Sequence, residues 1–162
     1  MPTPPEDGPP IRFEAVPATH DDAIDLARQA IDEVTRMYAD LDLSDAPSLE
    51  RLLAGRRGTV LVAYCGDEPV ACGAVRLLEA ETAEIKRMFV VAGRRGCGVG
   101  RGLLAELERA AAELGCDRVR LDTGERQLAA LALYRSAGYS EIAAYNVQSG
   151  ASHWFEKRLR LP

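Results

Sequence analysis

The chain has 162 residues, a length typical of one domain with a substantial hydrophobic core. Apolar residues make up 47% of it, and the mixed charges sum to a modest net charge of −5, which argues against a nucleic-acid binder. No apolar run approaches the roughly 20 residues that span a bilayer, and the acidic, proline-rich N-terminus is unlike a signal peptide. We therefore expect a cytoplasmic protein with neither a membrane nor a nucleic acid as partner.

Five prolines in the first ten residues predict a disordered tail, followed by one domain over residues 11–162. Alternating apolar residues over 11–16 predict a strand. Thr19 is the expected N-cap of an amphipathic helix that ends near Asp40. A polar loop over 42–47 then leads to a short helix that starts at Ser48 and stops at Gly55.

The remaining elements alternate between strands and helices. A hairpin of strands over 59–64 and 70–78 precedes a strand over 82–91, a helix over 98–114 and a strand over 118–121. A helix over 127–137 and strands over 139–147 and 152–161 complete the chain. This order predicts an α/β fold, with a mixed sheet covered by helices on both faces.

The cysteines give no sign of a metal site. They are Cys65, Cys72, Cys97 and Cys116, which form no C-x-x-C pair and have no histidine cluster near them. We expect no metal and free thiols.

A glycine-rich turn lies between the strand over 82–91 and the helix over 98–114. Glycines at 96, 98, 100 and 102 leave backbone N–H groups free to converge on an anion at the helix start. A P-loop would need lysine directly after Gly98, where Val99 stands, and G-x-G-x-x-G would need glycine at Arg101 or Leu103. Asp122, after a later strand, could act as the ribose acid of a Rossmann fold, but too few residues follow for its parallel strands. A nucleotide-binding domain is therefore disfavoured.

Two motifs in order resemble a known family. Arg95, Gly98 and Gly100 fill the pattern Arg/Gln-x-x-Gly-x-Gly/Ala, and residues 130–139, ALALYRSAGY, fill A-x-x-L-Y-x-x-x-G-F/Y. Together they resemble the GNAT superfamily of N-acetyltransferases, which bind acetyl-coenzyme A. The likeness is specific between about Ala83 and Tyr139, and in element order it extends from Ile11 onward. It implies an acyl-CoA N-acyltransferase fold of six to seven strands and about four helices, in which the strands ending near residue 91 and beginning near residue 118 splay apart.

The resemblance also implies how acetyl-CoA, the cosubstrate, is bound. The glycine loop and the following helix hold the pyrophosphate, and backbone N–H groups at the end of the preceding strand hold the pantetheine arm and polarise the thioester. Many members have asparagine where this chain has Gln127. The implied acetyl-CoA-binding residues are Met88, Phe89, Val90, Arg95, Gly96, Cys97, Gly98, Val99, Gly100, Arg101 and Gln127.

Two residues are candidates for proton transfer. Glu84, in Ala83-Glu84-Ile85, resembles the strand segment where histone-acetylating members place a general base; alternatively it is a solvent-exposed strand glutamate paired with Lys86 or Arg87. Tyr134 matches the family tyrosine near the coenzyme sulfur, a general acid; alternatively it packs on the sheet with its hydroxyl hydrogen-bonded.

The resulting hypothesis is an N-acetyltransferase in which a primary amine attacks acetyl-CoA directly in a ternary complex, without an acetyl-cysteine. A non-catalytic acyl-CoA-binding regulator with the same fold is the alternative. The acceptor, a small molecule or a peptide, is expected to contact the first helix, the loop over 41–47 and the late strands around 145–152. The oligomeric state stays open, with a homodimer among the options.

Overall fold

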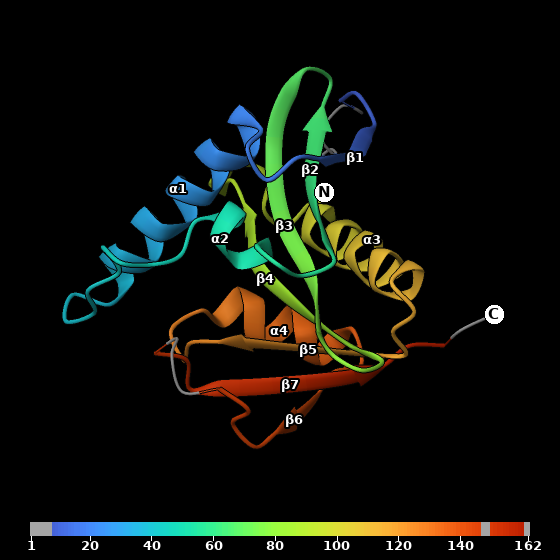
Figure 1. Ribbon diagram of the computed structural model, residues 1–162. Coiled ribbons are helices and arrows are strands. Elements are labelled where there is room, and N and C mark those ends of the chain that lie inside the picture. Colours follow the sequence, from blue (N-terminus) through green and yellow to red (C-terminus); the bar gives the residue numbers. More distant parts are fainter. Residues whose placement is uncertain (1–7, 147–149, 161–162) are drawn as a thin grey trace, which may run out of the picture.

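The computed structural model describes residues 8–146 and 150–160. Within these ranges one seven-stranded sheet has the order β1-β2-β3-β4-β5-β7-β6, and four α-helices cover it (Figure 1). The strands are β1 (Ile11–Val16), β2 (Gly58–Cys65), β3 (Glu68–Glu79), β4 (Thr82–Val90), β5 (Arg118–Thr123), β6 (Ser140–Ile142) and β7 (His153–Arg158). The helices are α1 (Asp21–Met37), α2 (Leu49–Leu53), α3 (Val99–Glu113) and α4 (Leu128–Ser136), with a single 3₁₀ turn, η1 (Ala92–Arg94). The predicted α/β class, strand number and helix number are confirmed.

Strand β2 shows why helices cover both faces of the sheet. Its residues alternate between two hydrophobic clusters, as the side chains of a strand must. Leu61 and Ala63 pack with α3 and α4, whereas Val60 and Val62 pack with α1 and α2. Figure 1 shows α1 and α2 on one side of the central strands and α3 on the other. A strand buried on both faces needs a continuous apolar run, and this is what residues 60–65 supply.

The predicted limits of α1 are slightly wrong at both ends. Its N-cap is His20, whose Nδ1 accepts a hydrogen bond from the Asp22 backbone N–H at 3.2 Å, not Thr19. The helix ends at Met37, because Tyr38 leaves the helical conformation two residues before Asp40. The short helix does begin where predicted, since the Ser48 Oγ accepts from the Arg51 N–H at 3.2 Å.

The late strands are shorter than predicted. β6 covers only 140–142, and residues 143–146 are not in a strand, since Asn146 is hydrogen-bonded through its side chain to Asp122 and Trp154 instead. Val147 and Leu161, the predicted ends of the last two strands, lie outside the described residues. So do residues 1–7 of the predicted tail, whereas residues 8–10 are described and exposed, with the Cys65 Sγ donating to the Pro9 carbonyl at 3.5 Å.

Candidate functional site

Strands β4 and β5 are paired over only three residue pairs and diverge beyond them. They run parallel only where Thr82–Glu84 face Arg118–Arg120, and in the described structure β5 does not pair with the rest of β4. We call the point beyond Glu84 and Arg120 the strand fork. The predicted splay of these strands is thus confirmed. A parallel sheet that opens at the carboxyl ends of its strands offers a natural binding crevice.

A β-bulge reshapes β4 directly after the fork. Cys72 of β3 faces Phe89, and Ala74 faces Lys86, so Gly73 opposes both Arg87 and Met88. Arg87 accordingly takes a left-handed φ of 57°, which is unusual for a residue with a side chain. The bulge was not predicted. Its one sequence signal is Gly73, a glycine inside a strand, which often marks such an irregularity.

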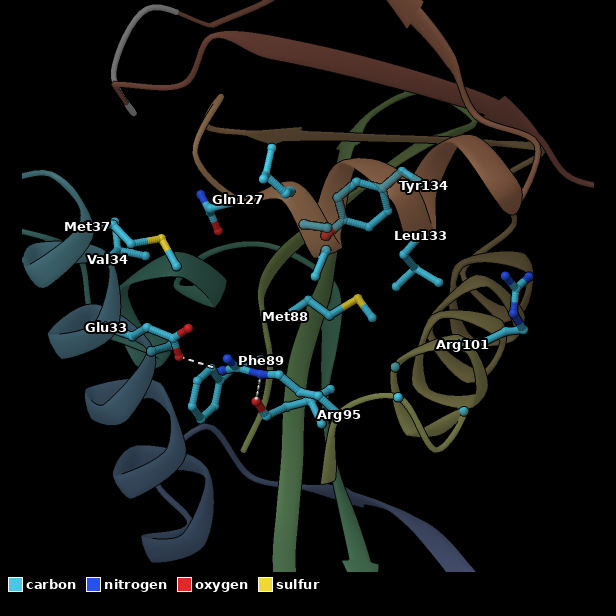
Figure 2. Close-up of a pocket in the computed structure, with 18 residues that line it drawn as sticks. Glu33, Val34, Met37, Met88, Phe89, Arg95, Arg101, Gln127, Leu133 and Tyr134 are labelled. Atoms are coloured by element: carbon cyan, nitrogen blue, oxygen red, sulfur yellow. Dashed lines mark hydrogen bonds and ion pairs between the residues drawn. The ribbon is translucent and has the colours of Figure 1, made fainter. Parts of the chain in front are cut away.

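A cleft of about 440 Å³ occupies the space that the fork opens (Figure 2). Its walls come from α1, the end of β4, the glycine loop Arg95–Gly102 and α4. The predicted residues that line it are Met88, Phe89, Val90, Arg95, Gly96, Gly98, Gly100, Arg101, Gln127 and Tyr134. The cleft therefore brings together three segments that lie far apart in the sequence, namely residues 30–37, 88–101 and 127–134.

Two predicted cofactor-binding residues do not line the cleft. The Val99 side chain, in the first turn of α3, is 3% exposed and belongs to the hydrophobic cluster that α3 and α4 share, and Cys97 is exposed. Acetyl-CoA binding by these two residues stays a prediction, which the backbone N–H groups of the loop could meet without a side-chain contact. Sequence reasoning expected the first helix to contact the acceptor but did not name the α1 residues that line the cleft, which are Ala30, Glu33, Val34 and Met37.

The glycine loop presents an uncapped helix N-terminus to the cleft. Gly98 is the N-cap of α3 with a φ of 84°, and no side chain caps the helix. The first intrahelical bond runs from the Gly102 N–H to the Gly98 carbonyl, so the N–H groups of the preceding turn have no partner within the helix. Gly96 has a φ of 77° and leaves open space where a Cβ would stand. This geometry suits a diphosphate.

Two arginines flank the glycine loop. Arg95 donates from Nε to the Val90 carbonyl at 2.9 Å and pairs with Glu33 of α1 at 2.5 Å, and it crosses the cleft floor in doing so (Figure 2). Arg101 donates to the Ser136 hydroxyl of α4 at 2.6 Å. Both guanidinium groups are suited to bidentate contact with phosphate oxygens.

Tyr134 closes the cleft on the α4 side. It is 6% exposed, and its ring packs against Tyr139 and Phe155 with centroids 5.9 and 6.1 Å away. Burial, and to a lesser extent the negative charge of Asp122, raises the pKa of the Tyr134 hydroxyl. The phenol is consequently protonated at neutral pH and able to donate a proton into the cleft.

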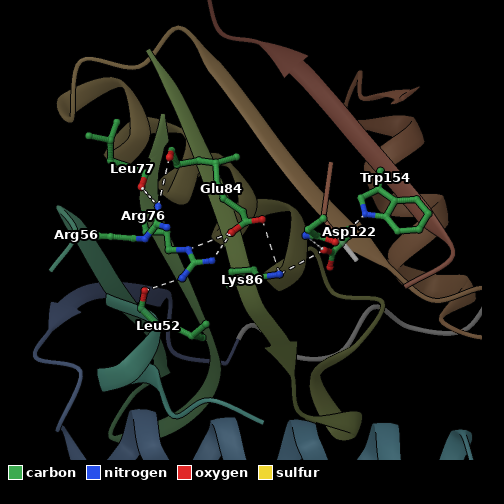
Figure 3. Close-up of polar contacts among 10 residues, drawn as sticks. Leu52, Arg56, Arg76, Leu77, Glu84, Lys86, Asp122 and Trp154 are labelled. Atoms are coloured by element: carbon green, nitrogen blue, oxygen red, sulfur yellow. Dashed lines mark hydrogen bonds and ion pairs between the residues drawn. The ribbon is translucent and has the colours of Figure 1, made fainter. Parts of the chain in front are cut away.

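Glu84 is not among the cleft-lining residues. It is 1% exposed on the α1 face of β4, where its Oε1 accepts from Arg76 Nε at 3.0 Å and from Arg76 Nη2 at 2.8 Å (Figure 3). Its Oε2 lies 3.8 Å from the Lys86 ammonium. The carboxylate is thus engaged in a buried ion-pair network. The alternative of a solvent-exposed glutamate is wrong in its exposure, although its expected partner Lys86 does lie beside Glu84. A catalytic role for Glu84 stays a prediction.

Lys86 links that network to the strand fork. Its ammonium lies 3.3 Å from Asp122 Oδ2, an oxygen that also accepts from Asn146 Nδ2 at 2.7 Å. Asn146 in turn accepts from the Trp154 Nε1 at 3.0 Å. Burial and the nearby charge of Glu84 raise the pKa of Tyr145 beside this cluster.

The described residues form neither a metal site nor a membrane-spanning helix. Within residues 8–146 and 150–160, no group of three or more histidine, cysteine, aspartate or glutamate side chains could hold a metal ion. Nor does any helix there have the length and apolarity required to cross a membrane. All four cysteines are free thiols.

Comparisons with known proteins agree with this geometry. The model of the acetyltransferase (GNAT) family matches residues 21–139. An IAA acetyltransferase of Azospirillum brasilense is 33% identical over 129 residues, which are 72% of this chain and 78% of that protein. A Klebsiella pneumoniae structure assigned as an acyl-CoA N-acyltransferase is 31% identical with a TM-score of 0.73, covering 93% of this chain and 98% of that one. The PaiA N-acetyltransferase of Thermoplasma acidophilum, solved with coenzyme A, has a TM-score of 0.72 at 17% identity, covering 92% and 99%.

Proposed function

Because this chain belongs to the GNAT family of acetyltransferases, we propose that it transfers an acetyl group from acetyl-CoA to a primary amine. The acceptor is a small molecule or a peptide, and its nitrogen attacks the thioester directly in a ternary complex. One observation carries the proposal: the cleft at the strand fork has an anion-binding loop at one end and a protonated tyrosine on its α4 wall.

The residues present fit the coenzyme. The N–H groups at the start of α3, with Arg95 and Arg101, would hold the pyrophosphate. The end of β4, from Met88 to Val90, would hold the pantetheine arm, because its edge toward β5 is free of strand pairing in the described structure. Backbone N–H groups there would also stabilise the negative charge that develops on the thioester oxygen, a contribution of about 3 kcal/mol per donor. Three related folds were solved with coenzyme A or acetyl-CoA, which supports this assignment.

Tyr134 is the proposed general acid. As the carbon–sulfur bond breaks, the leaving sulfur would take the Tyr134 proton. Its position supports the role, since Tyr134 lines the cleft on the α4 side and its phenol carries a proton at neutral pH. The acceptor would enter along the α1 wall, where Val34 and Met37 offer apolar contacts and Glu33 offers a negative charge. We place the reaction in the cytoplasm, with acetyl-CoA as its donor and no metal.

Calorimetry and an acceptor screen test the proposal together. Purified protein should bind acetyl-CoA in preference to ATP or NAD, and it should release coenzyme A thiol with at least one member of a panel of polyamines, aminoglycosides, amino acids and peptides. Binding of ATP or NAD without acetyl-CoA would refute the coenzyme assignment. Tight acetyl-CoA binding with no transfer to any amine would refute the enzyme and support an acyl-CoA-binding regulator of the same fold.

A further inference from the structure

Asp122 holds a position that neither the family motifs nor the cleft lining singles out. The last paired residues of β4 and β5 are Glu84 and Arg120, so Lys86 and Asp122 are the next residues on the same face of the two strands. No backbone pairing joins Lys86 to Asp122. Their side chains form an ion pair instead, with the Lys86 ammonium 3.3 Å from Asp122 Oδ2. The carboxylate therefore stands at the vertex of the strand fork, where the sheet opens.

Three neighbouring elements orient this carboxylate. Lys86 holds it from β4, Asn146 from the segment after β6, and Trp154 of β7 holds Asn146, as Figure 3 shows for the lysine and the tryptophan. Asp122 also faces Trp154 across the β5–β7 ladder. A side chain that is 10% exposed and accepts from both Lys86 and Asn146 is held in one orientation, as a positioned proton acceptor requires.

Glu84 and Arg76 explain why the Lys86 charge is directed at Asp122. The closest carboxylate oxygen to Lys86 is that of Asp122, since the Glu84 oxygen is 3.8 Å away and the other Glu84 oxygen is bound by Arg76 at 2.8 Å. Glu84 thus neutralises Arg76 and shares Lys86 only weakly. The buried glutamate acts through the lysine, as a positioning residue.

We propose that Asp122 is the general base of the acetyl transfer and that Glu84 positions it through Lys86. The inference rests on the proposed function. It gives a task to the carboxylate at the vertex of the fork, which the coenzyme assignment does not use. It also puts the acid and the base on opposite faces of the sheet where it opens, with Tyr134 on the α4 wall of the cleft and Asp122 on the face of β5 that it shares with Lys86 of β4.

The proton steps balance. The acceptor enters as the free amine, and as its nitrogen–carbon bond forms, the N–H bond becomes strongly acidic and its proton passes to an Asp122 oxygen. The carbon–sulfur bond breaks with the electron pair on sulfur, which takes the Tyr134 proton. The proton on Asp122 then returns to the Tyr134 oxygen, directly or through one water. Asp122 ends as a carboxylate and Tyr134 as a phenol, as both began.

The first test is Asp122→Asn, which keeps the size of the side chain and an acceptor for Asn146. Acetyl-CoA affinity should stay within about twofold, whereas kcat/KM for the best amine of the screen should fall about 100-fold or more. The matched control is Asp67→Asn in the exposed β2–β3 turn, which should leave the rate unchanged. A rate within threefold of wild type in folded Asp122→Asn protein would overturn the inference and leave the proposed function intact. Wild-type protein that acetylates no amine would instead overturn the proposed function itself.

The second test replaces Lys86 and does not depend on the folding of the first variant. Lys86→Met removes the ammonium that orients the Asp122 carboxylate, so kcat for the best amine should fall about tenfold while acetyl-CoA affinity stays within about twofold. Lys86→Arg, which keeps the charge, should restore most of the rate. Lys157→Met, which removes a lysine paired with Glu108 at 3.0 Å, should leave kcat unchanged. Wild-type kcat in folded Lys86→Met protein would overturn the positioning role and with it the assignment of the base.

Discussion

Replacing Tyr134 with phenylalanine isolates the proposed general acid. The Tyr134 hydroxyl makes no hydrogen bond to any described residue, so its loss breaks no bond inside the fold. The ring contacts with Tyr139 and Phe155 are retained by phenylalanine. We therefore expect the free energy of unfolding to change by less than about 0.5 kcal/mol.

The kinetic cost should be much larger than the structural one. Loss of a positioned proton donor lowers a rate by about 100-fold or more, and 100-fold corresponds to about 2.7 kcal/mol of activation free energy. Since Tyr134 is proposed to act on the leaving sulfur and not on the coenzyme's phosphates, the loss should appear in kcat, with acetyl-CoA affinity nearly unchanged.

The assay is release of coenzyme A thiol at saturating acetyl-CoA, combined with calorimetric titration of acetyl-CoA. Tyr139→Phe is the matched control, because Tyr139 is buried beside Tyr134 but its hydroxyl donates to Glu108 at 2.9 Å, away from the cleft. That variant should lose about 1 kcal/mol of stability and keep its kcat. Wild-type kcat in Tyr134→Phe would refute the reasoning, and equal losses of kcat in both variants would show that packing and not proton donation is responsible.

Three further changes test other parts of the structure. Arg95→Gln removes a guanidinium that borders the glycine loop, so calorimetry should show acetyl-CoA affinity about tenfold weaker, with a smaller dependence on salt. Glu84→Gln leaves Arg76 without its buried counter-charge, and denaturant unfolding should show a loss of about 3 kcal/mol. Burial and the hydrogen bond to Asp22 raise the pKa of Tyr64 to about 12. Because only the unfolded chain then ionises this tyrosine from pH 10 upward, stability should fall by about 2 kcal/mol between pH 10 and 12.

Each of these has a simple control. Arg109→Gln, on an exposed face of α3, should leave acetyl-CoA affinity unchanged. If Arg95→Gln and Arg109→Gln weakened acetyl-CoA binding equally, the effect would come from the net charge of the protein and not from a contact of Arg95. Glu14→Gln, in an exposed pair with Arg12, should cost less than about 1 kcal/mol. Tyr64→Phe should flatten the alkaline decline in stability, so an identical decline in that variant would assign it to other groups.

Short-range patterns were enough to predict the elements and the anion-binding loop. The glycines at 96 and 98 adopt the left-handed conformations that make the turn. Because the need for glycine at such a position is local, it can be predicted from the sequence. The continuous apolar run of β2 is likewise a local pattern, and it is typical of a strand buried on both faces. Small errors of one to three residues at the ends of α1 arise because capping depends on which side chain reaches the backbone, here His20 instead of Thr19.

The tertiary structure alone decided which polar residues meet. Glu84 and Arg76 are eight residues apart but face each other across β3 and β4, and Lys86 meets Asp122 over 36 residues because the parallel register of β4 and β5 aligns them. Neither pairing follows from a local pattern, since sheet register is set by the summed packing of both faces. The sequence by itself therefore determined the anion-binding loop and the family resemblance. The place of each carboxylate, one buried and one at the strand fork, was decided by strand pairing over long range, because the register that brings Arg76 to Glu84 and Lys86 to Asp122 has no local sequence motif.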